Sequence, residues 1–220
     1  MAELLVIRHA QAPFGSDDYD VLSDLGHRQA EAVGLALRNM GWVPDRLVTG
    51  TLRRQKDTLT GMGVSGAPEV HPGFDEYDFT DLLNARFGGA APDAVHRDRR
   101  THFHTLRETI LEWQAGGVPG AAESWAQFAA RIDAARDHAI RDGARRVLVV
   151  TSGGVIAQLV ASAMGAPAAQ MIELNLQVRN SAMTRFVYSA SDRARGLTLA
   201  EFNATPHFAD PERAALMSYH

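Results

Sequence analysis

The sequence predicts a single α/β domain with three layers (α/β/α), in which helices cover both faces of a mainly parallel β-sheet. Short apolar runs typical of buried strands alternate along the chain with longer segments of helical periodicity. The chain of 220 residues is 45% hydrophobic and 22% charged, which suits one sizeable core. Neither an internal repeat nor a low-complexity linker divides it. We therefore expect one domain over residues 1–220.

The first half of the chain predicts a buried strand followed by helices and strands in turn. Leu4 to Ile7 is a continuous apolar run, typical of a strand that is buried on both faces. Ser23 can cap a helix that runs to about Met40. The apolar stripe of this helix consists of Ala30, Val33, Leu37 and Met40. Further on we expect strands at Asp45–Val48 and Glu69–His71, a helix at Leu52–Leu59 and a loop at Gly73–Phe79.

The second half continues the alternation. Ser124 with Gln127 fits the capping box that starts a helix. Helices are expected at Thr101–Gln114, from Ser124 to Ala139 and from Gly153 to Met164, and strands at Val147–Val150, Ala182–Tyr188 and Leu197–Phe202. Open sheets of parallel strands carry their binding sites at the carboxyl ends of the strands. The polar residues that fall at such ends are Arg8, His9, Thr49 and Ser152.

Composition excludes several classes of function. The formal net charge is -4, whereas nucleic-acid binders usually carry a strong basic patch. No apolar run reaches the roughly 18 residues of a membrane span, and the first residues lack a signal-peptide pattern, so we expect a cytoplasmic protein. Cysteine is absent, which excludes disulfides, thiolate catalysis and cysteine-bound metals. The oligomeric state, monomer or homodimer, stays open.

Arg8 and His9 are the first candidate functional residues. They follow directly on a buried strand, and arginine is almost never fully buried unless it is paired. One interpretation is a solvated pair at a strand end. The other is phosphate chemistry, in which a planar guanidinium holds phosphate oxygens beside an imidazole that attacks phosphorus.

Five segments, in order, resemble the histidine phosphatase (phosphoglycerate mutase-like) superfamily. Arg8 to Ala12 is similar to its Arg-His-Gly-[Glu/Gln]-[Ser/Thr] signature, and Leu22 to Ala30 to its Leu-Thr-x-x-Gly-x-x-Gln-Ala helix start. Val48 to Thr58 resembles its Ser-Ser-x-Leu-x-Arg-Ala-x-x-Thr segment. Val149 to Gly154 matches its strand–His-Gly-Gly–helix segment except at the histidine, and Phe202 to Phe208 resembles its closing Asn…His-Leu stretch. The resemblance spans nearly the whole chain and implies a phosphoglycerate mutase-like fold.

The resemblance implies a phosphatase that acts on a small phosphoester through a phosphohistidine. His9 would be the nucleophile, and Arg8 would bind and neutralise the phosphoryl oxygens. Arg54 matches the family's second phosphate-binding arginine, since the Leu-x-Arg spacing from Leu52 favours it over Arg53. We expect neither a metal nor a cofactor, because arginines can neutralise the charge.

The remaining site residues are also implied by the resemblance. Glu76 lies where the family places the carboxylate that protonates the leaving oxygen and later activates water, with Asp75 and Asp78 as competitors in the same loop. Gln11 and Thr49 could donate supporting hydrogen bonds to the phosphate, and either could equally be a local cap. The amides that follow Ser152, starting at Gly153, would approach the anion at a helix start.

Ser152 departs from the family, which usually carries a second histidine at this place. Serine keeps one O–H donor but supplies no positive charge, and losing a charge-assisted donor could cost on the order of 10²–10³ in rate. The other histidines that could supply this donor are His207, His71, His102 and His104. Two smaller departures are Ala10 in place of glycine and Ala12 in place of a hydroxyl residue.

Three alternatives stay open. One is a mutase, in which a second substrate hydroxyl replaces water as the phosphoryl acceptor; the segment between Glu76 and Ser124 would shape that choice. Another is a weakly active or non-catalytic phosphate-binding module, which the serine at position 152 favours. In the third, Ser152 is the nucleophile of a hydrolase, with Asp192 and His207 as partners. The first glycine of the nucleophile-elbow pattern is, however, Val150 here.

Overall fold

The computed structural model describes residues 1–13, 20–92, 95, 98–191 and 196–219. Within them a six-stranded sheet has the order β3-β2-β4-β1-β5-β6. The strands are β1 (Ala2–Arg8), β2 (Arg46–Thr49), β3 (Glu69–Val70), β4 (Arg146–Thr151), β5 (Met183–Tyr188) and β6 (Thr198–Ala204). β1, β2, β3 and β4 pair in parallel, whereas β5 is antiparallel to both of its neighbours. The predicted α/β fold with a mainly parallel sheet is confirmed.

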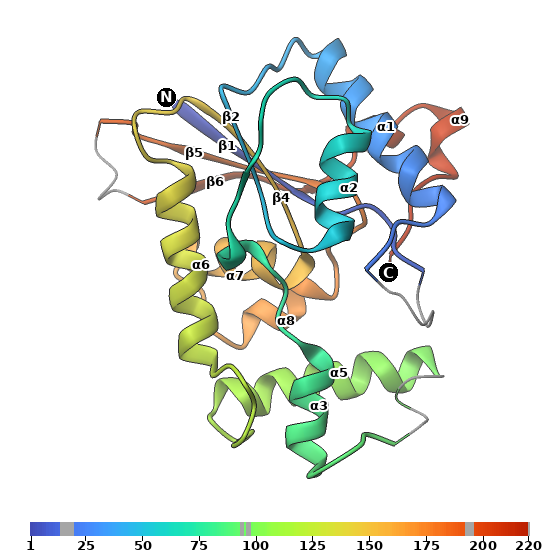
Figure 1. Cartoon of the computed structure of the whole chain (residues 1–220), viewed down its shortest axis with the longest axis vertical. Helices are drawn as coiled ribbons and strands as arrows, with labels where there is room; N and C mark the ends of the chain where they lie inside the picture. Colours follow the sequence, from blue (N-terminus) through green and yellow to red (C-terminus); the bar gives the residue numbers. More distant parts are fainter. Residues whose placement is uncertain (14–19, 93–94, 96–97, 192–195, 220) are drawn as a thin grey trace.

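Helices cover both faces of this sheet (Figure 1). On one face lie α1 (Asp24–Asn39) and α2 (Arg53–Gly61). On the other lie α6 (Trp125–Ala139), α7 (Gly153–Ala163) and α8 (Gln170–Asn175). The lower part of the figure holds α3 (Phe79–Phe87) and α5 (Arg99–Gln114). The short elements are the 3-10 helices η1 (Pro72–Phe74) and η3 (Pro206–Phe208) and the helix α9 (Pro211–Ala214).

The central strands are apolar throughout because both of their faces are covered. In β1, Leu4 and Val6 point into the core beneath α6 and α7, and Leu5 and Ile7 into the core beneath α1 and α2. The same alternation holds in β4, where Val147 and Val149 join the first core, and Leu148 and Val150 join the second. This two-sided burial is the physical reason for the continuous apolar runs of the sequence.

Side-chain caps start the helices where the sequence predicts them. The Ser23 hydroxyl accepts from the Gly26 N–H at the start of α1. Ser124 and Gln127 form a reciprocal capping box at the start of α6. Asp78 accepts from the Asp81 N–H and so begins α3, at the end of the segment Gly73–Phe79 that was expected to be a loop.

Several boundaries differ from the prediction. The helix expected at Leu52–Leu59 runs instead from Arg53 to Gly61, and the strand at Glu69–His71 ends at Val70. Met40 does not belong to the buried stripe of α1: it is 55% exposed, because it follows the last helical residue and leaves the buried face. The sequence analysis did not predict α3, α8 and α9; α8 and α9 have only six and four residues, which is too short for a clear apolar periodicity.

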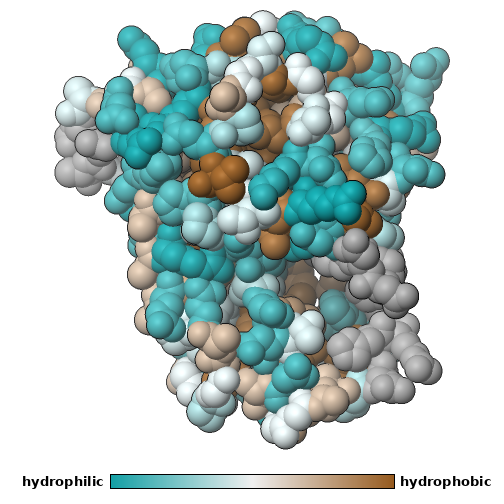
Figure 2. Space-filling model, in the orientation of Figure 1, coloured by the Kyte–Doolittle hydropathy of each residue, from teal (hydrophilic) through white to brown (hydrophobic). Residues whose placement is uncertain are grey.

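The surface in the same orientation is mostly hydrophilic, with apolar atoms exposed in small, separate areas (Figure 2). A hollow lies between the body that contains the sheet and the part formed by α3 and α5. In this view the carboxyl end of β4 points toward the hollow (Figure 1). Among the described residues, no helix is both long and apolar enough to cross a bilayer.

Substituting Gly34 by alanine tests the close contact between α1 and α2. A Cβ at this position would lie 1.8 Å from the carbonyl oxygen of Met62, at the end of α2. Helix propensity alone favours alanine over glycine by about 1 kcal/mol, so the sign of the effect reports the clash. We expect the free energy of unfolding to fall by about 1–3 kcal/mol, measured by urea denaturation. As a control, substitution of the exposed Glu31 on α1 by alanine should change it by less than about 0.5 kcal/mol. An unchanged Gly34→Ala stability would contradict this packing.

Candidate active site

The candidate site lies where three neighbouring parallel strands end. β1 ends at Arg8, β2 at Thr49 and β4 at Thr151, and the register pairs Arg8 with Thr151. The backbone N–H of His9 extends this pairing by one bond and donates to the Thr151 carbonyl at 2.8 Å. His9 and Ser152 therefore leave adjacent strands side by side.

His9 is buried, and its tautomer follows from its contacts. Only 2% of the residue is exposed. Ring atom Nδ1 lies 2.8 Å from the carbonyl oxygen of Ala10, an acceptor, so Nδ1 carries the proton. Nε2 is then the unprotonated nitrogen, and it accepts from Nε of Arg54 at 3.3 Å. The lone pair on Nε2 of the imidazole thus points toward the second arginine.

Both predicted arginines reach this region and are buried. Arg8 is 3% exposed, and its Nη1 donates to the carbonyl oxygen of Val178. Arg54, on the first turn of α2, is 9% exposed, and its Nη1 also donates to Oδ1 of Asp20 at 2.9 Å. This burial is incompatible with a solvated pair of side chains at the end of β1. Arg54 contacts the His9 imidazole, and the charges of both arginines act on the nearby Glu76 carboxyl.

Glu76 joins the same cluster. Its Oε2 accepts from the backbone N–H of Gly154 at 2.9 Å, and its Oε1 from the N–H of Tyr77 at 3.2 Å. Burial raises the pKa of the Glu76 carboxyl above its usual range, although the Gly154 N–H and the charges of Arg54 and Arg8 oppose this rise. A carboxyl with a raised pKa stays protonated to higher pH, so it can serve as an acid.

The two competing carboxylates have other contacts. Asp75 accepts from the backbone N–H and the hydroxyl of Thr51, both at 2.5 Å, and so holds the turn before α2. Asp78 is exposed and caps α3. Glu76, in contrast, lies close enough to Arg8 and Arg54 for their charges to act on its carboxyl.

Two adjacent glycines allow this cluster to close. A Cβ at Gly153 would lie 2.5 Å from Oδ1 of Asn175 and 3.6 Å from Cζ of Arg8. A Cβ at Gly154 would lie 2.3 Å from Oε1 of Glu76. The start of α7 therefore packs directly against Asn175 and the Glu76 carboxylate, with the Arg8 guanidinium at ordinary contact distance, and a side chain at either glycine would force these groups to shift.

Ser152 is completely buried at the N-cap of α7, yet it forms no capping hydrogen bond. Its hydroxyl accepts from Nε2 of Gln55 at 2.9 Å. Gln55 follows Arg54 on α2, is itself fully buried, and also donates to the carbonyl oxygen of Phe74 at 3.0 Å. Sequence reasoning did not single out Gln55. Its only signal was a large polar residue where the family's segment has alanine.

Gln11 and Thr49, the two residues expected to donate supporting hydrogen bonds, have different contacts. Gln11 has its side-chain oxygen engaged by the Ser23 hydroxyl at the start of α1. Thr49 is buried at the end of β2, and within the described residues its Oγ1 has no hydrogen-bond partner. Asp20 was also missed by the sequence reading, because nothing in its neighbourhood marks it as a partner of Arg54.

The four histidines that could replace the family's usual histidine at position 152 have other contacts. Nε2 of His207 lies 3.2 Å from the Ser181 hydroxyl, and burial lowers the pKa of His207 to about 4. His71 accepts from the Gly73 N–H, and a ring nitrogen of His102 lies 3.1 Å from the Val95 carbonyl. His104 pairs with Glu108 on the exposed side of α5. Asp192, the third member of the hydrolase alternative, lies outside the described residues.

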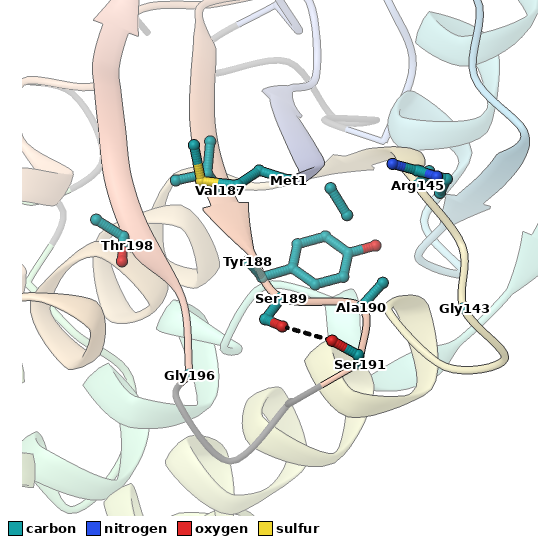
Figure 3. A pocket seen from close by; sticks show the side chains of 11 residues that line it. Met1, Gly143, Arg145, Val187, Tyr188, Ser189, Ala190, Ser191, Gly196 and Thr198 are labelled. Atoms are coloured by element: carbon teal, nitrogen blue, oxygen red, sulfur yellow. Dashed lines mark hydrogen bonds between the residues drawn. The ribbon is translucent and has the colours of Figure 1, made fainter.

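A cavity of about 680 Å³ lies elsewhere, at the opposite edge of the sheet. Figure 3 shows the ring of Tyr188 in it, between Met1, Arg145 and the pair Ser189 and Ser191. The Tyr188 hydroxyl donates to the carbonyl of Ala144 at 2.6 Å, and burial raises its pKa to about 12. None of the predicted site residues lines this cavity. Nor do the described residues contain a cluster of three or more histidine, aspartate or glutamate side chains suited to a metal ion.

Several solved structures with the same fold are phosphatases. A mycobacterial glucosyl-3-phosphoglycerate phosphatase is 24% identical, over 93% of this chain and 100% of its own, with a TM-score of 0.68; its complex with VO3 gives the same identity and coverage and a TM-score of 0.65. An alpha-ribazole phosphatase from Shigella flexneri is 18% identical over 92% of this chain and 96% of its own, with a TM-score of 0.67. An Entamoeba histolytica phosphoserine phosphatase, solved with 3-phosphoglyceric acid, is 18% identical over 94% and 99%, with a TM-score of 0.63.

These likenesses establish the fold. A search of curated protein sequences gives no match. The family model of the histidine phosphatase superfamily (branch 1) matches residues 4–198, which include every residue of the cluster described above. With its motifs in order, its fold and this match, the chain belongs to the histidine phosphatase superfamily, branch 1.

Proposed function

We propose that the chain hydrolyses phosphate monoesters through a phosphohistidine on Nε2 of His9. The observation that carries the proposal is the contact of 3.3 Å between this unprotonated nitrogen and the Arg54 guanidinium. A phosphoryl group that bridges the two would put phosphorus in front of the nucleophile and its oxygens among the arginine donors. On binding, Arg54 would transfer its hydrogen bond from the imidazole to the phosphate.

The reaction then needs two displacements. Nε2 of His9 attacks phosphorus, the ester bond breaks, and the protonated Glu76 donates its proton to the leaving oxygen. In the second step water gives a proton to the Glu76 carboxylate and attacks phosphorus, which breaks the P–N bond and releases inorganic phosphate. Arg8 and Arg54 neutralise the charge on the phosphoryl oxygens in both steps.

A phosphate-binding module without turnover is the second candidate. It is favoured by Ser152, which supplies no positive charge to the anion. Such a module would bind vanadate or phosphate but would form no phosphoenzyme. A mutase would differ only in the acceptor, a substrate hydroxyl in place of water. The single domain over residues 1–220 and the cytoplasmic location stay predictions, and the oligomeric state, monomer or homodimer, stays open.

Removing the nucleophile is the first test. We expect His9→Ala to lower kcat/KM for p-nitrophenyl phosphate by at least about 10³-fold, the scale of losing a catalytic nucleophile. Wild type quenched during turnover should carry a phosphoryl group that is lost in acid, as a P–N bond predicts. The control His104→Ala alters an exposed histidine of α5 and should leave the rate unchanged. Equal rates for wild type and His9→Ala would refute the nucleophile.

Two substrates with different leaving groups test whether Glu76 is the proton donor. An alkyl phosphate needs a proton on its leaving oxygen, whereas p-nitrophenolate leaves without one. We expect Glu76→Gln to slow the alkyl ester by about 10²-fold or more relative to the p-nitrophenyl ester. Because the raised pKa keeps the acid protonated, wild-type kcat for the alkyl ester should fall as the pH rises through that pKa, and this fall should vanish in Glu76→Gln.

The neighbouring carboxylate Asp78 is the matched control for this test. Asp78→Ala removes the cap of α3 and should lower the free energy of unfolding by about 1 kcal/mol. It should leave the ratio of rates for the two esters unchanged. If Asp78→Ala shifts that ratio and Glu76→Gln does not, the acid has been assigned to the wrong residue.

A further inference from the structure

In the hydrogen bond between Gln55 and Ser152, the donor and the acceptor can be assigned. The Gln55 atom that lies 2.9 Å from Ser152 Oγ also lies 3.0 Å from the carbonyl oxygen of Phe74. A carbonyl oxygen can only accept, so the atom facing it must be the amide nitrogen. Since this nitrogen donates to Ser152 as well, the serine oxygen is the acceptor of the pair.

The serine hydrogen is therefore available to another acceptor. Within the described residues Ser152 donates to no group, and it makes no capping bond to α7. The residues before and after Ser152 in the sequence belong to the site. Thr151 accepts from the His9 N–H through its carbonyl, and the next two residues pack against Arg8 and Glu76. An anion bound by Arg8 and Arg54 would be an acceptor for the hydrogen of the Ser152 hydroxyl.

Gln55 fills the space next to the small serine. Its Oε1 has no hydrogen-bond partner among the described residues, and a Cβ at Gly50 would lie 2.0 Å from this atom. A side chain at residue 50 would therefore force the Gln55 carboxamide to move from this position. In the segment that Val48 to Thr58 resembles, alanine stands where Gln55 does and serine where Gly50 does. Of the three departures, at positions 50, 55 and 152, Gln55 lies against both of the others.

We propose that Gln55 is a positioning residue that turns the Ser152 hydroxyl into a directed donor to the phosphoryl oxygen. Gln55 and Ser152 together thereby replace the histidine that the family usually carries at position 152. Gly50 leaves space for the Gln55 side chain. This inference rests on the proposed phosphate chemistry. It also means that a histidine introduced at position 152 would collide with the Gln55 carboxamide, so Ser152→His alone cannot restore the family's usual arrangement.

A double-mutant cycle tests the coupling, read as kcat/KM for p-nitrophenyl phosphate and as vanadate affinity. Ser152→Ala removes the donor, and we expect a loss of about 10²-fold in kcat/KM. Gln55→Met keeps the length and removes the donating amide, so the hydroxyl can occupy any of three staggered positions. The expected loss is about threefold or more. In the Ser152→Ala background, Gln55→Met should have no further effect on either quantity.

A purely structural role of Gln55 gives a different result. Its hydrogen bond to Phe74 would then matter as much in the Ser152→Ala background as in wild type, and the two losses would multiply. That outcome, or unchanged kcat/KM and vanadate affinity in both single variants, would overturn the inference. If wild type itself neither turns over nor binds vanadate, the proposed function has failed, and the role of the pair fails with it.

The steric half of the inference has its own test. Ser152→His should be less stable and less active than Gln55→Ala with Ser152→His, because the second substitution makes room for the imidazole. We expect the double variant to exceed Ser152→His in kcat/KM by about tenfold or more, and its pH–rate profile to gain an ionisation at about pH 6.5. Ser152→His that is stable and as active as the double variant would refute the collision with Gln55.

Discussion

The parallel pairing of β1 and β2 with β4 is the constraint on which the rest of the site depends. Because these strands end at one edge of the sheet, residues far apart in sequence leave it together, and the bond from the His9 N–H to the Thr151 carbonyl fixes their register. The apolar faces of β1 and β4, buried under helices on both sides, hold the strands in place. A change of one residue in this register would exchange the two faces and disperse the site.

Within this arrangement of strands, the charges of the buried side chains determine their chemical roles. Two buried guanidinium groups are stable only near an acceptor or an anion, and part of their charge is met by the Val178 carbonyl and by Asp20. Glu76 lies close enough to both arginines to respond to their charge, yet burial still raises its pKa. Desolvation therefore outweighs attraction here, and the raised pKa widens the pH range in which this carboxyl can donate a proton.

The carbonyl oxygen of Phe74 ties the loop before Glu76 to the strands. It accepts from the Thr151 hydroxyl at 2.5 Å and from the Gln55 amide at 3.0 Å. One backbone oxygen thus links η1, α2 and the end of β4, and it orients the amide that holds Ser152. The same contacts that place the loop also determine which way the serine hydroxyl can donate.

The sequence by itself determined the alternation of strands and helices, the two-sided burial of β1 and β4, the caps at Ser23 and Ser124, and the family. Each of these follows from local patterns of apolar, small and capping residues. Only the tertiary structure decided which acidic residue of the loop meets the arginines, and that Gln55 reaches Ser152 across 97 positions of sequence. These depend on side-chain contacts between distant segments, and no local pattern records them. Whether a polar residue is buried against a partner or solvated is settled by packing, as Arg8 and Arg54 illustrate.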